Sequence, residues 1–127
     1  MRQMCEEMSK LRKMLDEAGI KWKDVSTIAS DRLIKEECIA TGMDEFRVDT
    51  TVYRTHFEHE GYFFSVIYGY STYGGCDPLS GHDPRLLECM TEKVNGGEPL
   101  GWLTAEQVME IVNRGNEVDY LTHSQGD

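Results

Sequence analysis

The sequence predicts an α+β fold, in which a small antiparallel sheet packs with an N-terminal helix and two C-terminal helices. Three observations lead to this class: helical spacing of apolar residues near the N-terminus, β-branched and aromatic runs in the middle, and capping signals in the last third. The 127 residues fit a single domain, because soluble domains typically contain about 100–200 residues.

The first element is a helix with a narrow, methionine-rich apolar face. Its apolar residues recur at steps of three and four: Met4, Met8, Leu11, Leu15 and Ala18. Gly19 can end the helix, and Ile20 can then fold back onto its last turn. This face has two possible partners, which are the protein's own sheet and a helix of a second copy.

Residues 24–45 give a weaker signal. Ser26 can act as an N-cap and Gly42 as a stop, but the apolar face between them is ragged. We interpret the segment as an inserted helical or loop segment.

The middle of the chain predicts two strands that form an antiparallel hairpin. Residues 46–52 alternate apolar with polar side chains, and the alternation changes parity at residues 53–57, which indicates a bulge or a strand that is covered on both sides. Residues 59–61 can turn the chain, and residues 62–68 return as a mostly apolar strand. The glycine-rich residues 69–81 are expected to form a loop.

A helix is expected after this loop. Asp83 can cap it and Pro84 suits its first position, where the missing N–H costs nothing. Leu86, Leu87 and Met90 would face inward, and residues 95–97 (Asn-Gly-Gly) would end it.

The remaining residues predict a short strand and a last helix. Residues 100–103 are suited to the strand, and residues 104–107 (Thr-Ala-Glu-Gln) have the composition of a capping box. Gly115 can end the helix, and the polar residues 116–127 are expected to be a flexible tail.

The charge distribution restricts the partners. The chain carries 13 Lys+Arg against 23 Asp+Glu, so it lacks the positive charge with which proteins bind bulk nucleic acid. Residues 24–127 carry a net charge of −12, whereas residues 1–23 carry +2. No apolar stretch has the ~18 residues of a membrane span, no secretory segment is recognisable, and the four cysteines are widely spaced. These features favour the cytoplasm and no membrane partner.

Neither a catalytic nor a metal-binding signature is present. His56 and His59 are three residues apart, so on a strand they would point to opposite faces and could not share a metal. Cys76, His82 and Cys89 could converge, but a fourth ligand is missing. The sequence also has no nucleophile motif and no nucleotide-binding glycine fingerprint. We therefore expect no metal, no cofactor and no enzymatic activity.

An almost uncharged window lies between Gly61 and His82, where Asp77 is the one charged residue. Its tyrosines offer rings on which a base can stack, and its glycines allow backbone N–H groups to approach phosphate oxygens. The alternative is purely structural, with a buried strand that ends in a glycine turn and tyrosines that pack inside.

A phosphate ligand also needs cations. Arg54 is the first candidate, because it lies in the strand paired with the window and its planar fork suits phosphate. His56 follows on the same face, Arg85 lies in the expected helix after the loop, and Arg114 ends the last helix, where it can also stabilise the helix end. The candidate ligand-binding residues are Arg54, His56, Phe64, Tyr68, Tyr70, Thr72, Tyr73, Gly74, Gly75, Arg85 and Arg114.

Four segments in succession carry a resemblance to a known family. They are KLRKMLDEAGIKWKD, YRTHFEHEGYFFSVIYGYSTYGG, LLECM and GEPLGWLTAEQVMEIV, and the similarity covers most of residues 11–112. This succession resembles the phage anti-Thoeris sponge proteins of the first type, which sequester cyclic nucleotides made by bacterial immune enzymes. Residues 25–45 do not match the pattern.

The resemblance implies an α+β fold with a helix packed on an antiparallel sheet, and homodimers that can build a higher homo-oligomer. It also implies that the protein binds its ligand without catalysis. The implied ligands are cyclic ADP-ribose isomers and, for some members, cyclic oligonucleotides.

Three functional hypotheses remain open. The first is a protein that sequesters a small cyclic nucleotide in the host bacterial cytoplasm and so blocks activation of an immune effector. The second is an acidic nucleic-acid mimic that inhibits a basic bacterial defence enzyme, because residues 24–127 are strongly acidic. The third is an enzyme that degrades cyclic nucleotides, with His56 as its essential residue.

Overall fold

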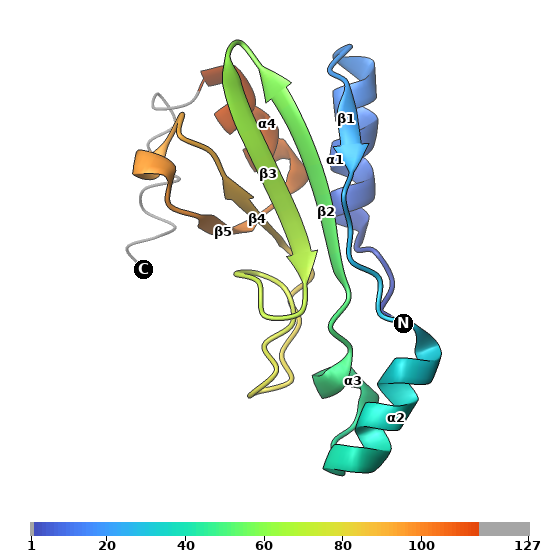
Figure 1. Cartoon of the computed structure of the whole chain (residues 1–127). Helices are drawn as coiled ribbons and strands as arrows, with labels where there is room; N and C mark the ends of the chain where they lie inside the picture. Colours follow the sequence, from blue (N-terminus) through green and yellow to red (C-terminus); the bar gives the residue numbers. More distant parts are fainter. Residues whose placement is uncertain (1, 115–127) are drawn as a thin grey trace.

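The computed structural model describes residues 2–114, which form one five-stranded antiparallel sheet with helices before, within and after it (Figure 1). The strands lie in sequence order, β1-β2-β3-β4-β5, and the expected α+β class is confirmed. In chain order the elements are α1 (Glu6–Glu17), β1 (Trp22–Asp24), α2 (Asp31–Thr41), α3 (Glu45–Val48), β2 (Val52–His59), β3 (Tyr62–Gly69), β4 (Leu87–Met90), the 3₁₀ turn η1 (Asn95–Gly97), β5 (Leu100–Leu103) and α4 (Ala105–Arg114).

Within residues 2–114, helices cover one face of the sheet and leave the other face open. α1 and α4 lie behind the sheet in Figure 1 and share one apolar core with it. α1 contributes Met8, Leu11 and Leu15 to this core, all fully buried. The protein's own sheet is therefore the partner of the apolar face of α1.

The two ends of α1 are fixed by hydrogen bonds. Gly19 has a left-handed backbone, and the N–H groups of Gly19 and Ile20 donate to the carbonyls of Asp16 and Leu15 over 3.1 and 2.9 Å. This pattern ends the helix where the sequence predicted. Near the other end, Glu7 Oε1 accepts a 2.7 Å hydrogen bond from the N–H of Ala105 and so caps α4.

β2 and β3 form the expected hairpin, but their shared register is continuous. Val52 pairs with Gly69 and His59 with Tyr62, so the bulge expected at residues 53–57 is absent from this pairing. Glu60 and Gly61, both with positive φ, make the two-residue turn.

The strand expected at residues 46–52 is wrong, because residues 46–48 belong to the short helix α3 and residues 49–51 form no strand. A carboxylate oxygen of Asp44 accepts a 3.1 Å hydrogen bond from the N–H of Arg47 and caps this helix. The local capping interaction outweighs the alternating pattern, and the strand begins at Val52.

The helix expected after Asp83 is also wrong. Asp83 Oδ1 accepts a hydrogen bond from the N–H of Arg85, whose φ of 60° turns the chain away from a helix. The following residues form β4, which pairs with β3 and buries Leu87 and Cys89 in the core. Pairing with a neighbouring strand therefore overrides the Asp-Pro capping signal.

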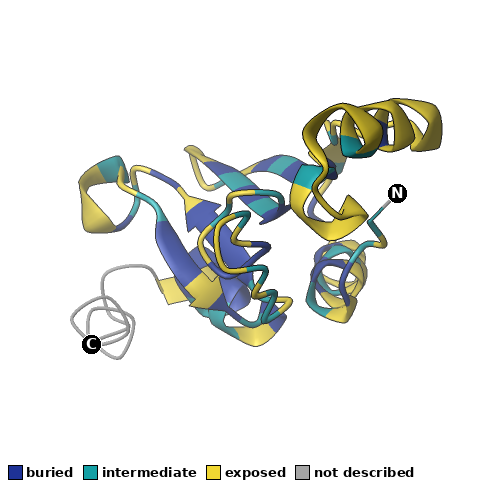
Figure 2. Ribbon diagram, turned by 90° about the horizontal axis from the view of Figure 1, so that it is seen from below, coloured by how far each residue is buried: buried dark blue, intermediate teal, exposed yellow. Residues whose placement is uncertain are grey.

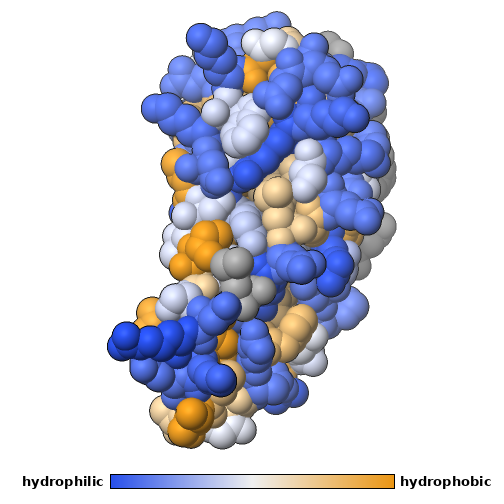
Figure 3. Space-filling model, turned by 90° about the vertical axis from the view of Figure 1, so that its right-hand side faces the viewer, coloured by the Kyte–Doolittle hydropathy of each residue, from blue (hydrophilic) through white to orange (hydrophobic). Residues whose placement is uncertain are grey.

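Residues 31–48, which we call the arm, contain α2 and α3 and project from one end of the sheet (Figure 1). Ser30, rather than the expected Ser26, caps α2 by accepting from the N–H of Leu33, and Gly42 ends it as predicted. Ile34 is the one buried residue of α2, and Figure 2 shows this helix almost wholly exposed. The surface of the arm mixes apolar and charged side chains (Figure 3).

Arg2 fastens the base of the arm to the sheet. Its guanidinium donates hydrogen bonds to the carbonyls of Phe46, Asp49 and Thr51, at 3.0, 2.7 and 3.3 Å, and lies 5.6 Å from the centre of the Phe46 ring. One side chain near the N-terminus thus connects three positions more than 40 residues away.

The C-terminal part agrees with the sequence prediction. Residues 100–103 form β5, and Thr104 and Gln107 exchange the two hydrogen bonds of a capping box, at 2.9 and 3.3 Å. Gly115 and the expected flexible tail 116–127 lie outside the described residues. Within residues 2–114, none of the helices has the length and apolar character that a membrane crossing requires.

Candidate ligand-binding site on the open face of the sheet

The open face of the sheet presents a polar and aromatic surface. Because side chains alternate along a strand, the residues of β2 and β3 that lie between the core positions point to this side. The pairing of neighbouring strands aligns these residues in rows across the sheet. Lys23, His56, Ser65 and Met90 form one row, Arg54, Ile67 and Glu88 a second, and Glu58 and Phe63 a third.

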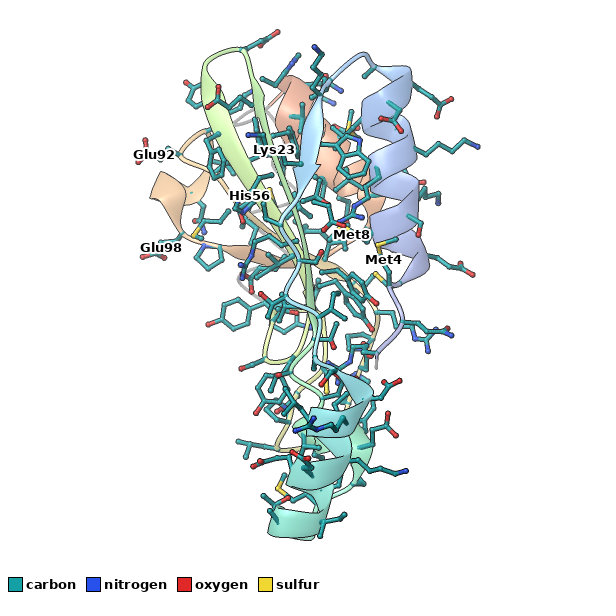
Figure 4. The ribbon with its side chains drawn as sticks, turned by 45° about the vertical axis from the view of Figure 1, so that its right-hand side comes forward. Met4, Met8, Lys23, His56, Glu92 and Glu98 are labelled. Atoms are coloured by element: carbon teal, nitrogen blue, oxygen red, sulfur yellow. The ribbon has the colours of Figure 1, made fainter. Side chains whose placement is uncertain are left out.

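Arg54 and Lys23 supply the positive charge of this face. The guanidinium of Arg54 makes no hydrogen bond or ion pair to another side chain within residues 2–114, although its backbone N–H donates to Ser26 Oγ at 2.9 Å. Lys23 is exposed and pairs in register with His56, beside which it lies in Figure 4. An arginine with a free planar fork on a half-buried surface is suited to an anion.

Glu88 lies in the same row as Arg54 and is only 9% exposed. Burial raises the pKa of its carboxyl group, while a 2.8 Å hydrogen bond from the N–H of Tyr73 and the positive charge of Arg54 act in the opposite direction. The carboxylate therefore anchors the loop after β3 and weakens the positive potential beside Arg54.

His56 connects the polar and aromatic parts of the face. Its Nε2 lies 3.0 Å from Ser65 Oγ, and its ring makes an edge contact with Phe63 at 4.9 Å between centroids. Burial lowers the pKa of His56, and the nearby charge of Arg54 lowers it further. The histidine is thus held neutral at pH 7 and fixes the position of Phe63.

The glycine loop after β3 uses its N–H groups for its own structure. The N–H of Thr72 donates to the carbonyl of Gly69, that of Gly75 to Thr72, and that of Cys76 again to Gly69. Thr72 Oγ1 also accepts from the N–H of Gly69. These groups are not directed at an external phosphate, so this loop does not form the anion cradle that its composition suggested.

Gly75 is required by close packing rather than by a ligand. A Cβ atom at this position would lie 2.2 Å from Thr72 Oγ1 and 2.4 Å from the carbonyl oxygen of Gly69. Gly74 is buried likewise, against the backbone of Trp102. Tyr73 is exposed and stacks on Trp102, with 5.7 Å between the ring centroids, beside a hollow of about 330 Å³.

Besides Thr72, Gly74 and Gly75 of the loop, the structure keeps five further sequence candidates away from the open face. Phe64 and Tyr68 are buried in the core, where Phe64 stacks on Phe57 and the Tyr68 hydroxyl donates to Asp83 at 2.7 Å. Both side chains are therefore inaccessible to a ligand in this conformation.

Tyr70, Arg85 and Arg114 lie elsewhere. Tyr70 lines a groove beside the arm, and Arg85 is exposed in the turn before β4 rather than in a helix. Arg114 ends α4, on the helical side of the sheet, and pairs with Glu110 at 3.2 Å. The sequence candidates on or beside the open face are thus Arg54, His56 and, at its edge, Tyr73.

Sequence reasoning missed five residues of this surface. They are Lys23, Phe63, Glu88, Met90 and Trp102. A signal for Phe63 was present, because it has the same parity as Ser65 and Ile67 and opposes the buried Phe64 and Val66. Glu88 and Met90 could not be placed, since β4 had been expected to be a helix.

Metal ligands do not converge on this face. Among residues 2–114 no group of three or more His, Cys, Asp or Glu side chains is placed to hold a metal ion. The four cysteines are free thiols, and burial raises the pKa of Cys5, Cys76 and Cys89. The chemistry that the face offers is therefore hydrogen bonding, charge and aromatic stacking.

Neither the known protein families, nor the curated proteins, nor the solved structures with which the chain was compared contain a match to it.

Proposed function

We propose that the protein binds a small cyclic nucleotide on the open face of its sheet and holds it without cleaving it. The observation that carries the proposal is Arg54, a half-buried guanidinium that has no side-chain hydrogen bond within residues 2–114, on the same face as the exposed ring of Phe63. A phosphate and a planar base are the two groups that such a surface can hold. The sequence resemblance to anti-Thoeris sponge proteins supplies the ligand class, and it places the activity in the cytoplasm of an infected bacterium.

Retention of the ligand intact is consistent with the groups on this face. Hydrolysis of a phosphodiester needs an activated nucleophile and a group that protonates the leaving oxygen. Here His56 faces Ser65, and among residues 2–114 neither of them has a hydrogen-bonded carboxylate that would orient it. Sequestration would lower the concentration of free signal and so keep an immune effector inactive.

The test is binding followed by recovery of the ligand. The purified protein is titrated with cyclic ADP-ribose isomers and with cyclic dinucleotides in a calorimeter. The bound ligand is then released by heat, and its mass is measured by mass spectrometry. Arg54→Ala should weaken binding by about tenfold or more, because a hydrogen bond to a charged group contributes about 1.5–3 kcal/mol. The nucleotide should return with its original mass.

Arg32→Ala is the matched control, because Arg32 lies on the arm and pairs with Glu36 at 3.1 Å. It should leave the affinity unchanged. If none of these nucleotides binds, the proposal is wrong. A linearised product that disappears in His56→Ala would identify a degrading enzyme instead.

The proposal includes homo-oligomers, which the resemblance implies. Light scattering coupled to size-exclusion chromatography would give the mass of the protein with and without nucleotide. A mass of one chain under both conditions would contradict this part of the proposal and leave ligand binding unaffected.

The arm favours a second candidate, an acidic inhibitor of a basic defence enzyme. It exposes Glu36, Glu37 and Asp44 beside Leu33 and Ile39, and Ile39 is 81% exposed. Glu36→Gln combined with Glu37→Gln should abolish inhibition in this case. The same double variant should bind nucleotide normally if the open face is the functional site.

A further inference from the structure

One hollow borders the open face at the end farthest from the arm. It measures about 610 Å³ and lies between the tip of the β2–β3 hairpin and the segment that follows β4. Phe63, Met90 and Glu92 are among its walls. Its volume lies within the range of about 300–1,000 Å³ that is typical of small-molecule sites.

Phe63 is the aromatic wall of this hollow and is held in place. The edge contact with His56 fixes its ring, and His56 is in turn held by Ser65. The ring nevertheless remains 50% exposed, and Met90 beside it is 44% exposed. A preordered apolar ring of this kind offers a stacking surface, which contributes about 1–3 kcal/mol per base in nucleic-acid-binding proteins.

The charges of the open face change sign between its two ends. Arg54 lies four residues from Glu58 on β2, which is about 13 Å along a strand. Glu58 pairs in register with Phe63, and Glu92 lines the hollow, whereas Glu98 stands farther along the same margin in Figure 4. A ligand with a phosphate at one end and hydrogen-bond donors at the other end would match this arrangement.

We infer that the hollow is the base subsite of the nucleotide site and that, among cyclic dinucleotides, Glu92 makes it prefer guanine over adenine. The inference rests on the proposed function, because it places the phosphate of the same ligand on Arg54. Guanine carries the N1–H and N2–H₂ donors side by side, and an ionised carboxylate can accept from both with its two oxygens. Adenine presents the N1 acceptor on that edge, which a carboxylate repels.

Cyclic di-GMP and cyclic di-AMP are the probes, because they differ only in their bases. Calorimetry should show at least tenfold tighter binding of cyclic di-GMP. Phe63→Leu keeps an apolar side chain but removes the ring, and it should weaken the binding of cyclic di-GMP about tenfold. Phe46→Leu is its control, because Phe46 is an exposed aromatic residue on the arm, outside the hollow, and it should leave that affinity unchanged.

Glu92→Gln tests the selectivity directly, with Glu98→Gln as the matched control. Glutamine keeps the shape of the side chain but presents an N–H₂ group, so the preference for cyclic di-GMP should fall to about twofold or less. Glu98→Gln should retain the full preference. Circular dichroism should give the same spectrum for all four variants, because each substitution is at an exposed position.

The outcomes separate this inference from the proposed function. Equal affinity for the two dinucleotides would overturn guanine selectivity, and a preference that persists in Glu92→Gln would overturn the role of Glu92. Either result would leave the Arg54 site intact. An affinity unchanged by Phe63→Leu would overturn the base subsite. Absence of binding by both dinucleotides and by cyclic ADP-ribose isomers would overturn the proposed function, and the inference with it.

Discussion

The two faces of the sheet are built from the same strands but differ in how much of their side chains remains exposed. On the helical face Phe64 and Val66 of β3 are fully buried. On the open face, Phe63 of the same strand is half exposed, and the guanidinium of Arg54 on β2 makes no hydrogen bond or ion pair to another side chain of the described residues. The covered face thus accounts for stability, and the open face retains the groups that a ligand can use.

The largest expected effect on stability comes from a substitution in the covered face. Leu11→Ala removes a fully buried side chain of α1 and should lower the free energy of unfolding by about 2–5 kcal/mol. Chemical denaturation followed by circular dichroism measures this loss. Ile39→Ala, on the exposed arm, should change stability by no more than about 0.5 kcal/mol. A similar loss in both variants would contradict the assignment of the core to this face.

A smaller effect is expected in the loop that joins β3 to β4. Gly75→Ala places a methyl group against Thr72 and the carbonyl of Gly69, and overpacking of this kind costs about 1–3 kcal/mol. Thermal unfolding should show the loss, and nucleotide affinity measured well below the melting temperature should stay the same. A variant with normal stability and lost affinity would show instead that this loop contacts the ligand.

The arm should respond more weakly and only locally. Ser30→Ala removes the N-cap of α2, which typically contributes about 1 kcal/mol. Because α2 buries only Ile34, we expect faster amide hydrogen exchange within α2 and unchanged exchange in β2 and β3. Faster exchange throughout the sheet would indicate that the arm and the sheet unfold as one unit.

The smallest expected effect on stability depends on pH and comes from Glu88 on the open face. The pKa of Glu88 is raised in the folded protein, so folding favours the protonated carboxyl and this group becomes destabilising as the pH rises through its folded pKa. Glu88→Gln keeps an acceptor for the N–H of Tyr73 and should stabilise the protein at pH 8 more than at pH 4. Melting temperatures at the two pH values measure the difference, and an equal shift at both would contradict a raised pKa of Glu88 in the folded protein.

Loss of the Glu88 charge should also affect the open face. In Glu88→Gln the potential beside Arg54 becomes more positive, so anionic nucleotides should bind more tightly at pH 8. The wild-type protein should approach this affinity as the pH falls through the raised pKa of Glu88, because its carboxylate then takes up a proton. Calorimetric titrations of both proteins from pH 8 downward would reveal whether their affinities converge.

The sequence predicted those parts of the fold that local signals determine. The stop at Gly19, the hairpin turn at Glu60–Gly61 and the capping box at Thr104 each depend on residues within a few positions of one another, and all are present. The helix expected after Asp83 failed because pairing of β4 with β3 is a long-range interaction. The Asp83-Pro84 sequence that suggested a helix start forms a turn before β4 instead.

The candidate site was predicted only in part, because local patterns indicate some of its residues and long-range packing determines the others. Arg54 and His56 followed from strand parity, which is local, and both lie on the open face. Phe64 and Tyr68 were chosen for their aromatic character, but burial depends on which face the helices cover. Lys23 reaches the site only because β1 pairs with β2, an interaction that no pattern near Lys23 indicates.

The bond between Glu7 and Ala105 also bears on the order of folding. It joins residues 98 positions apart, and Lys10 and Glu106 form a second link 2.8 Å long beside it. The neighbouring strands of the sheet, by contrast, are joined by connections of at most a few tens of residues and can close early. A ribosome must therefore release nearly all of the described chain before α4 can dock on α1. Until then the part of the core that α4 covers stays exposed to solvent, and exposed apolar surface promotes aggregation. Docking of the last helix therefore removes a surface through which the nascent protein could aggregate.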